Sequence, residues 1–256
     1  MPTINYQVKG SGRPLILLHG FCETLETWNH FDELLSSQAQ VFTPDLPGFG
    51  SSPLPKGGFR IDDVAGLLAD WITEEKILSP VLLGHSLGGY VTLALEEQYP
   101  QLTVAFGLLN STAQADTSEK KENRLKVIDF VQEHGVAKYV DAFIPGLFYQ
   151  KQNEAIPMAI DIARITPLQT FVQYTLAMRA RPPRESVIQK SRKPILIVAG
   201  EQDAGIPLEA MNRQAGLNTL VELHVLPDTG HMCFFESEKA SASAISGFIG
   251  AISARP

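Results

Sequence analysis

Apolar residues in this chain alternate between short continuous runs and longer segments with helical spacing. The runs cover residues 14–18, 40–43, 81–84, 104–110, 194–200 and 220–226. Residues 1–9 alternate polar and apolar positions in the manner of one further strand. Between the second and third runs, Ile61, Val64 and Leu68 recur at the spacing of one helix face. This alternation is typical of a mostly parallel sheet flanked by helices, so we expect an α/β fold.

The pattern changes after residue 110. A polar, charged stretch over 118–124 is followed by helix-like segments, and no run typical of a buried strand returns before residue 194. The prolines in Arg181-Pro182-Pro183-Arg184 favour an extended connection back to the sheet. We therefore predict a mostly helical insertion over 112–190, with the sheet formed by residues 1–111 and 191–256.

The third run leads directly into a glycine-rich turn. The sequence Gly84-His85-Ser86-Leu87-Gly88-Gly89 is followed by a helix-like segment over 90–99. A nucleophile held in a strained turn needs glycine neighbours, because strand and helix approach closely there. The helix N-terminus also favours the negative charge that forms on attack. Ser86 is thus the predicted nucleophile, and strand alternation predicts that His85 points away from it.

The first run ends in a turn of mostly small residues, His19-Gly20-Phe21-Cys22. An acyl-transfer site needs two backbone N–H groups aimed at the negative oxygen of the tetrahedral intermediate. We assign these N–H groups to Phe21 in this turn and to Leu87 after the nucleophile. His19 is expected to pack beneath the turn in a structural role.

The last two runs end in loops that carry a carboxylate and an imidazole. Asp203 follows the fifth run in Glu201-Gln202-Asp203, and His231 follows the sixth run. In the chain order nucleophile, acid, base, both lie downstream of Ser86, whereas Asp45 lies upstream and is expected to be a turn residue. Asp203 is the predicted acid, with Glu201 as the alternative. His231 is the predicted base, because an imidazole with a pKa of about 6.5 can accept and return a proton at neutral pH.

Composition excludes several classes of function. The chain has 256 residues, of which 44% are hydrophobic, and its net charge of -7 offers no basic surface for nucleic acid. Two cysteines are too few for a disulfide framework and lack metal-ligand spacing, so we expect thiols. No segment has the pattern of a signal peptide or of a membrane span, which predicts a cytoplasmic protein without a membrane partner. No metal site or nucleotide loop is evident, so no cofactor is expected.

Together these motifs resemble the α/β-hydrolase fold superfamily over residues 3–252. The matching features, in order, are His19-Gly20 with Trp28, Asp45-Leu-Pro-Gly-Phe-Gly50-Ser51-Ser52, Gly84-His-Ser-Leu-Gly-Gly89, Gly200-Glu-Gln-Asp203 and Gly230-His231. The resemblance implies an eight-stranded sheet with a helical cap, residues 112–190, inserted after the sixth strand. Within the superfamily the chain looks like the small cap-bearing carboxylesterases, enol-lactonases, carbon–carbon bond hydrolases and cofactor-free perhydrolases.

Ser86 separates this chain from haloalkane dehalogenases and epoxide hydrolases, which carry Asp at that position, although hydroxynitrile lyases can show a similar elbow. We expect hydrolysis of a small carboxylic ester through an acyl-enzyme. A lactonase or carbon–carbon bond hydrolase with the same triad, or a low-turnover ligand sensor on this fold, are the alternatives. Phe143, Phe148, Phe171 and Tyr174 either roof a pocket for an apolar part of the substrate or pack as the core of the insertion. The sequence does not indicate the oligomeric state.

Overall fold

The predicted apolar runs form neighbouring strands of one β-sheet in the computed structural model, which describes residues 4–253. The strand order is β1-β3-β2-β4-β5-β6-β7, with β1 antiparallel to β3 and the other neighbours parallel. The strands are β1 (Tyr6–Lys9), β2 (Arg13–Leu18), β3 (Ala39–Pro44), β4 (Val81–His85), β5 (Ala105–Leu109), β6 (Ile195–Gly200) and β7 (Val221–Leu226). The strand predicted over 1–9 begins in residues 1–3, which lie outside the described residues.

The strand count differs from the one that the family resemblance implied. Residues 4–253 hold seven strands rather than eight, and the helical insertion follows the fifth strand rather than the sixth. Each of the seven strand-like segments in the sequence accounts for one strand. The eighth strand came from the resemblance alone, with no apolar or alternating segment to form it.

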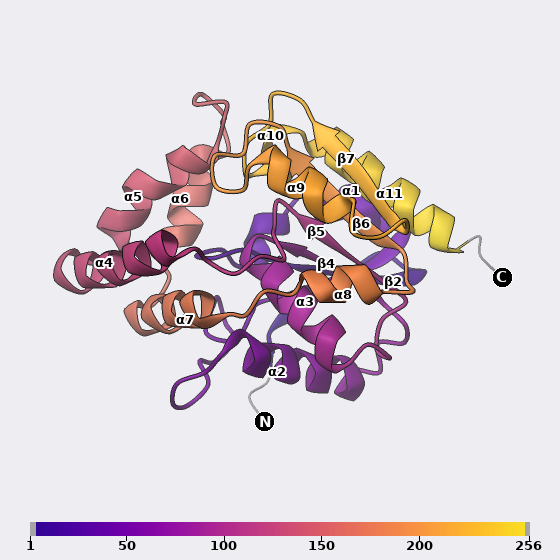
Figure 1. The fold of residues 1–256 in the computed structure, drawn as a ribbon, viewed down its shortest axis with the longest axis horizontal. Helices are drawn as coiled ribbons and strands as arrows, with labels where there is room; N and C mark the ends of the chain where they lie inside the picture. The colour runs from indigo at the N-terminus through magenta and orange to yellow at the C-terminus, as the bar shows by residue number, and fades with distance from the viewer. Residues whose placement is uncertain (1–3, 254–256) are drawn as a thin grey trace.

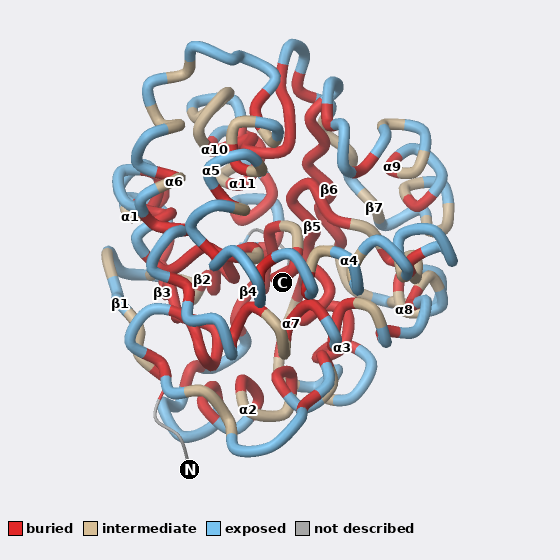
Figure 2. The backbone as a smooth tube through the Cα atoms, turned by 90° about the vertical axis from the view of Figure 1, so that its left-hand side faces the viewer, coloured by how far each residue is buried: buried red, intermediate tan, exposed pale blue. Residues whose placement is uncertain are grey.

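Helices cover both faces of the sheet, which explains why the central strands are apolar throughout. In β2, Leu15 and Leu17 pack into one cluster with α1, α10 and α11, whereas Ile16 and Leu18 pack on the opposite face with α2 and α3. The α-helices outside the segment between β5 and β6 are α1 (Phe31–Ser36), α2 (Ile61–Glu74), α3 (Leu87–Gln98), α9 (Leu208–Ala215), α10 (Cys233–Glu236) and α11 (Glu238–Ser253). Figure 2 shows the result, with buried backbone along β2, β4 and β5 and exposed backbone on the outer helices.

Five helices lie between β5 and β6, in the segment where the sequence has no strand-like apolar run. They are α4 (Ser118–His134), α5 (Val136–Leu147), α6 (Ile156–Arg164), α7 (Leu168–Ala180) and α8 (Glu185–Lys190). In Figure 1, α4 to α7 lie to the left of the sheet. The last helix, α8, returns to the sheet, where Ile188 packs against Phe106 of β5. The division into a core and a separate cap stays a prediction.

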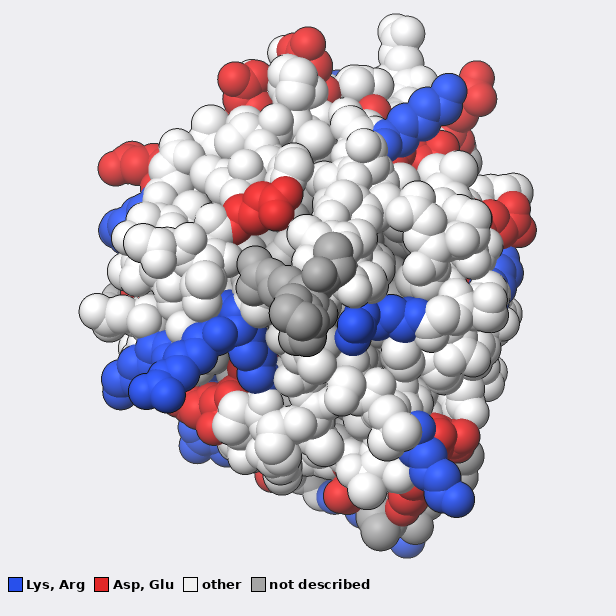
Figure 3. Space-filling view, turned by 90° about the vertical axis from the view of Figure 1, so that its right-hand side faces the viewer, with Lys and Arg blue, Asp and Glu red and all other residues white. Residues whose placement is uncertain are grey.

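The surface is mixed in charge. On the face drawn in Figure 3, Lys and Arg side chains and Asp and Glu side chains are interspersed among uncharged residues. In the described part of the chain, no helix combines the length and the apolar character that a membrane span requires.

Candidate active site

The parallel strands bring the predicted site residues to one edge of the sheet. Strands β2, β4, β5, β6 and β7 run in the same direction, so the loops that follow them meet at their carboxyl ends. This edge of an α/β sheet is where ligands bind in folds of this class.

Ser86 is the single residue between β4 and α3. Its backbone has φ 48° and ψ -111°, a conformation that costs a non-glycine residue about 1–3 kcal/mol. The glycines on either side are required by space: a Cβ on Gly84 would lie 2.3 Å from the carbonyl carbon of Gly88, and a Cβ on Gly88 would lie 2.4 Å from the carbonyl oxygen of Leu18. The structure therefore has the sharp strand-to-helix turn that the sequence predicts.

The backbone of Ser86 is fixed from both sides of the turn. Its N–H donates to the carbonyl oxygen of Leu109 at 3.0 Å, and the Ser111 hydroxyl donates to its carbonyl oxygen at 2.7 Å. The Ser86 hydroxyl itself has no hydrogen-bond partner among residues 4–253. A link between Ser86 and His231 therefore stays a prediction.

The predicted acid and base lie in direct contact. His231 Nδ1 is 2.7 Å from Asp203 Oδ2, and both residues are buried. The backbone N–H groups of Gly205 and Ile206 donate to the other carboxylate oxygen at 2.8 and 3.0 Å. Glu201, the alternative acid, is exposed, and its carboxylate accepts from Gln202 rather than from His231. Geometry thus favours Asp203.

The electrostatics of this pair follow from its contacts. Burial alone would raise the pKa of Asp203, but the charge and hydrogen bond of His231, with the donors Asn110 and Ile206, lower it to about 2. Burial alone would lower the pKa of His231, but Asp203 outweighs burial and raises it above 6.5. The carboxylate is therefore ionised at neutral pH and stabilises the protonated imidazole.

Asn110 is a site residue that the sequence did not single out. It directly follows β5, with φ 45°, a left-handed conformation that asparagine adopts more readily than most residues. Its Nδ2 donates to Asp203 Oδ2 at 2.9 Å and to the carbonyl oxygen of Gly230 at 3.1 Å. Asn110 therefore joins the acid to the loop that carries the base. A polar residue immediately after an apolar run is the signal that could have identified it.

Neither of the two backbone N–H groups predicted to hold the oxyanion is used in a hydrogen bond within the described residues, and one of them lies in the loop after β2. The N–H groups of Phe21 and Leu87 have no acceptor within the described residues. His19 is fully buried beneath this loop: its Nε2 accepts from the Leu46 N–H at 2.9 Å, so its Nδ1 donates to the Gly20 carbonyl oxygen, also at 2.9 Å. This is the structural role that the sequence predicts for His19.

His85 contacts the loop that carries the base, a contact about which the sequence made no prediction. Its ring centroid is 4.9 Å from that of His231, and its Nε2 is 3.0 Å from the His231 carbonyl oxygen. Strand alternation gave the direction of the side chain relative to Ser86, but it carried no information on which later loop would pack there.

Both cysteines are free and buried. Burial raises the pKa of the Cys22 thiol well above its usual range and that of Cys233 to about 12, so both are thiols at neutral pH. Among residues 4–253, no cluster of His, Cys, Asp and Glu has the geometry to hold a metal ion.

Comparisons with known proteins agree with this architecture. A family model described as the alpha/beta hydrolase fold matches residues 13–238. The 2-(acetamidomethylene)succinate hydrolase of Mesorhizobium japonicum is 25% identical over 258 residues, covering 97% of this chain and 92% of the relative. Lipase 3 of a Moraxella species is 24% identical over 259 residues, covering 93% and 78%.

Two solved structures extend the comparison. A thermophilic esterase from Thermogutta terrifontis, described with malate bound, superposes with a TM-score of 0.92 at 28% identity, covering 97% of this chain and 93% of that one. The enol-lactonase from Burkholderia xenovorans superposes with a TM-score of 0.88 at 20% identity, covering 96% of each chain. The second likeness shows the fold alone. The fold predicted from the motifs is confirmed.

Proposed function

The chain is a hydrolase that belongs to the α/β-hydrolase fold family, and we propose that it cleaves a small carboxylic ester through an acyl-enzyme formed on Ser86. One observation carries the proposal: the buried contact of 2.7 Å between Asp203 and His231 at the same sheet edge as the strained Ser86 turn. The ionised carboxylate accepts the Nδ1–H of His231, which leaves the Nε2 lone pair free to act as a base.

The reaction follows from this tautomer. His231 Nε2 takes the proton of the Ser86 hydroxyl while Ser86 Oγ bonds to the ester carbonyl carbon, and the carbonyl π electrons move to oxygen. The N–H groups of Phe21 and Leu87 hold that negative oxygen. His231 then returns the proton to the departing alkoxide as the carbon–oxygen bond breaks. Water, deprotonated by His231, then attacks the carbonyl carbon of the acyl-enzyme. The bond between that carbon and Ser86 Oγ breaks, His231 returns the proton to Oγ, and the acid is released.

The insertion is proposed to cap this site, with residues 112–190 over a core of 1–111 and 191–256. The ring of Phe21 lies against that of Phe171 in α7, with centroids 4.8 Å apart. The centroid of the Phe171 ring is in turn 5.3 Å from that of Tyr139 in α5. A hollow of about 390 Å³ opens between α4 and α5, lined by Val127, Phe130, Tyr139, Ala142 and Phe143 with two lysines. We assign an apolar part of the substrate to this hollow.

The aromatic residues of the insertion divide between the two roles weighed from the sequence. Phe148, Phe171 and Tyr174 are fully buried and pack as core. Phe143 is half-buried and lines the hollow.

A cytoplasmic location is part of the same proposal, supported by the two buried free thiols. Enzyme activity in cytosolic rather than periplasmic or secreted fractions of cells that express the gene would test it.

The first test compares the wild type with Ser86→Ala on p-nitrophenyl acetate, butyrate and octanoate at neutral pH. We expect loss of kcat by a factor on the order of 10⁴ or more in the variant, because no other group replaces the nucleophile. The control is Ser37→Ala, which removes an exposed hydroxyl at the end of α1. Activity that survives in Ser86→Ala contradicts the proposal. If the wild type hydrolyses none of these esters, the assignment shifts to a lactonase, a carbon–carbon bond hydrolase or a ligand sensor.

A further inference from the structure

A buried carboxylate and imidazole lie beneath the site loops and take no part in the proposed reaction. Glu23 is 5% exposed and His85 is fully buried. The two Glu23 oxygens lie 3.1 and 3.3 Å from His85 Nδ1. Glu23 belongs to the loop after β2, and His85 is the last residue of β4, so the pair connects the ends of two neighbouring strands.

Glu23 closes the loop around the proposed donor Phe21. The Gly20 N–H donates to Glu23 Oε2 at 2.8 Å, so the carboxylate spans the backbone of Phe21 and Cys22. Cys22 has φ 60°, a strained conformation that persists only where the surroundings fix it. A Cβ on Gly20 would lie 2.5 Å from Glu23 Oε1 and 2.8 Å from His85 Nδ1. The pair therefore packs directly against the backbone that leads into the Phe21 N–H.

His85 extends this connection to the base. Its Nε2 lies 3.0 Å from the His231 carbonyl oxygen, and because that oxygen only accepts, Nε2 carries the hydrogen. Nδ1 faces the Glu23 carboxylate, so one hydrogen lies between the two groups. Burial opposes ionisation of Glu23, but the neighbouring His85 charge and the hydrogen bonds from His85 and Gly20 lower its pKa overall. The arrangement is thus a carboxylate and an imidazole that are hydrogen-bonded to each other, to the Gly20 N–H and to the His231 carbonyl oxygen.

We propose that Glu23 and His85 are positioning residues that hold the Phe21 N–H and the His231 loop in the geometry needed for the transition state. This inference rests on the proposed ester hydrolysis. The loop after β2, the end of β4 and the loop after β7 meet at the pair. Stability alone gives little reason for it, because burial of a carboxylate carries a desolvation cost that offsets most of the attraction to its partner.

The test uses Glu23→Ala and Glu23→Gln with p-nitrophenyl butyrate. Loss of the acceptor for the Gly20 N–H frees the loop, so Glu23→Ala should lower kcat on the order of 10- to 100-fold, the usual consequence of a misplaced reacting group. KM should change by less than about threefold, since ground-state binding does not use the oxyanion donors. A heptyl trifluoromethyl ketone, whose adduct with Ser86 carries an oxyanion, should lose affinity in parallel with kcat.

Glu23→Gln serves as the conservative variant. Its amide oxygen can still accept from Gly20, and its NH₂ can donate to the Nδ1 of a neutral His85 that keeps its Nε2–H on His231. We expect it to recover most of the kcat and ketone affinity that Glu23→Ala loses. Recovery of this kind points to hydrogen-bond geometry, because Gln keeps the size of Glu and the acceptor for Gly20 but not the negative charge.

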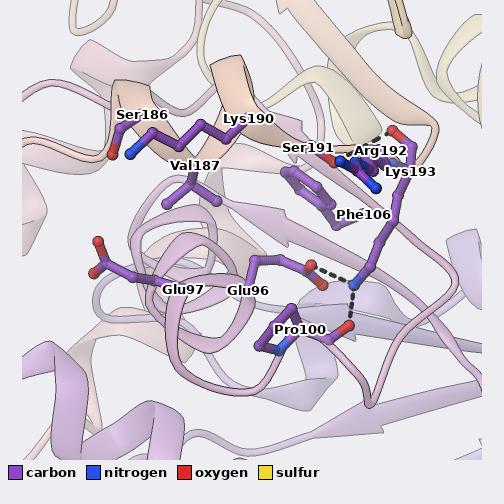
Figure 4. A pocket seen from close by; sticks show the side chains of 10 residues that line it. All are labelled: Glu96, Glu97, Pro100, Phe106, Ser186, Val187, Lys190, Ser191, Arg192 and Lys193. Carbon is purple, nitrogen blue, oxygen red and sulfur yellow. Dashed lines mark hydrogen bonds and ion pairs between the residues drawn. The ribbon is translucent and has the colours of Figure 1, made fainter.

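A matched control lies at the other end of α3. Glu96 is also a buried carboxylate with a cationic partner, Lys193 Nζ at 2.6 Å, and it lines a cavity of about 390 Å³ formed with α8 (Figure 4). Glu96→Ala should lower Tm, as loss of a buried ion-pair partner does. It should leave kcat and the ketone affinity at wild-type values.

The outcomes separate the inference from the function. Wild-type kcat and ketone affinity in folded Glu23→Ala overturn the positioning role, and so does an equal loss in Glu96→Ala. If Glu23→Ala does not fold, Glu23→Asp replaces it: the carboxylate is then withdrawn by one methylene, and full retention of ketone affinity overturns the inference. Activity in Ser86→Ala would instead overturn the proposed function itself.

Discussion

At the scale of single residues, the Asp203–His231 pair sets the pH range in which the base is available. A base must be neutral to accept a proton, so activity requires that the imidazole has lost its second hydrogen. Asp203 raises the pKa of His231 above 6.5 because its ionised carboxylate favours the imidazolium. The side chain is therefore protonated and inactive below that raised pKa, and it becomes competent as the pH rises through it.

The pH profile provides the corresponding prediction. We expect kcat/KM for p-nitrophenyl acetate to rise with pH to a plateau, with a midpoint above 6.5, the ordinary value for histidine. In Ser86→Ala, NMR titration of the His231 ring should give a pKa above the same value, and adding Asp203→Asn should move it downward. A midpoint below 6.5, or no change on adding Asp203→Asn, would contradict the assignment of Asp203.

The sequence predicts a site residue only where its position directly after a strand is enough to assign its role. Ser86 directly follows an apolar run, and Asp203 and His231 occupy loops that follow two others, so each could be assigned from chain order and chemistry. Glu23 gave no such signal. Its partners, the Gly20 N–H and His85 Nδ1, come within reach only after two strands pair and a loop adopts the strained backbone at Cys22.

At the scale of elements, close approach of backbones decides where glycine is required. Gly88 lies in the first turn of α3, where a Cβ would meet the carbonyl oxygens of Leu18 and His19 at 2.4 and 2.8 Å. These atoms belong to the end of β2 and its loop, and neither can move without disturbing the sheet. The glycine pattern that identified the turn in the sequence is thus explained by contacts with a strand more than sixty residues earlier in the chain.

Gly88→Ala should therefore destabilise the protein by about 1–3 kcal/mol, the range for overpacking a filled site. The matched control is Gly247→Ala in α11, where a Cβ meets nothing within 4 Å and alanine should stabilise the helix by about 0.5–1 kcal/mol. Urea denaturation of both variants measures the difference. Equal effects of the two substitutions would show that α3 can move away from β2.

At the scale of the whole molecule, the insertion is attached unevenly to the sheet-bearing part. Helix α7 is fastened to the loop after β3: the Tyr174 hydroxyl donates to the Pro47 carbonyl oxygen and the Thr170 hydroxyl to that of Gly48, each at 2.8 Å. Helix α4 buries only Ile128 and Val131 of its 17 residues. Sequence predicted a helical insertion from the absence of apolar runs, but side-chain bonds to a distant loop have no periodic pattern, so it could not tell which helix carries the attachment.

This unevenness predicts that parts of the insertion open independently. Amide hydrogens of α4 should exchange at least about tenfold faster than those of α7, because local opening there exposes few buried contacts. Tyr174→Phe removes the donor to Pro47 and should raise exchange in α7 while leaving α3 protected. Tyr149→Phe, which alters a 46% exposed side chain, is the control. Hydrogen exchange read by mass spectrometry distinguishes the cases: equal exchange in α4 and α7 would mean that the insertion opens as one unit and that α7 is no anchor.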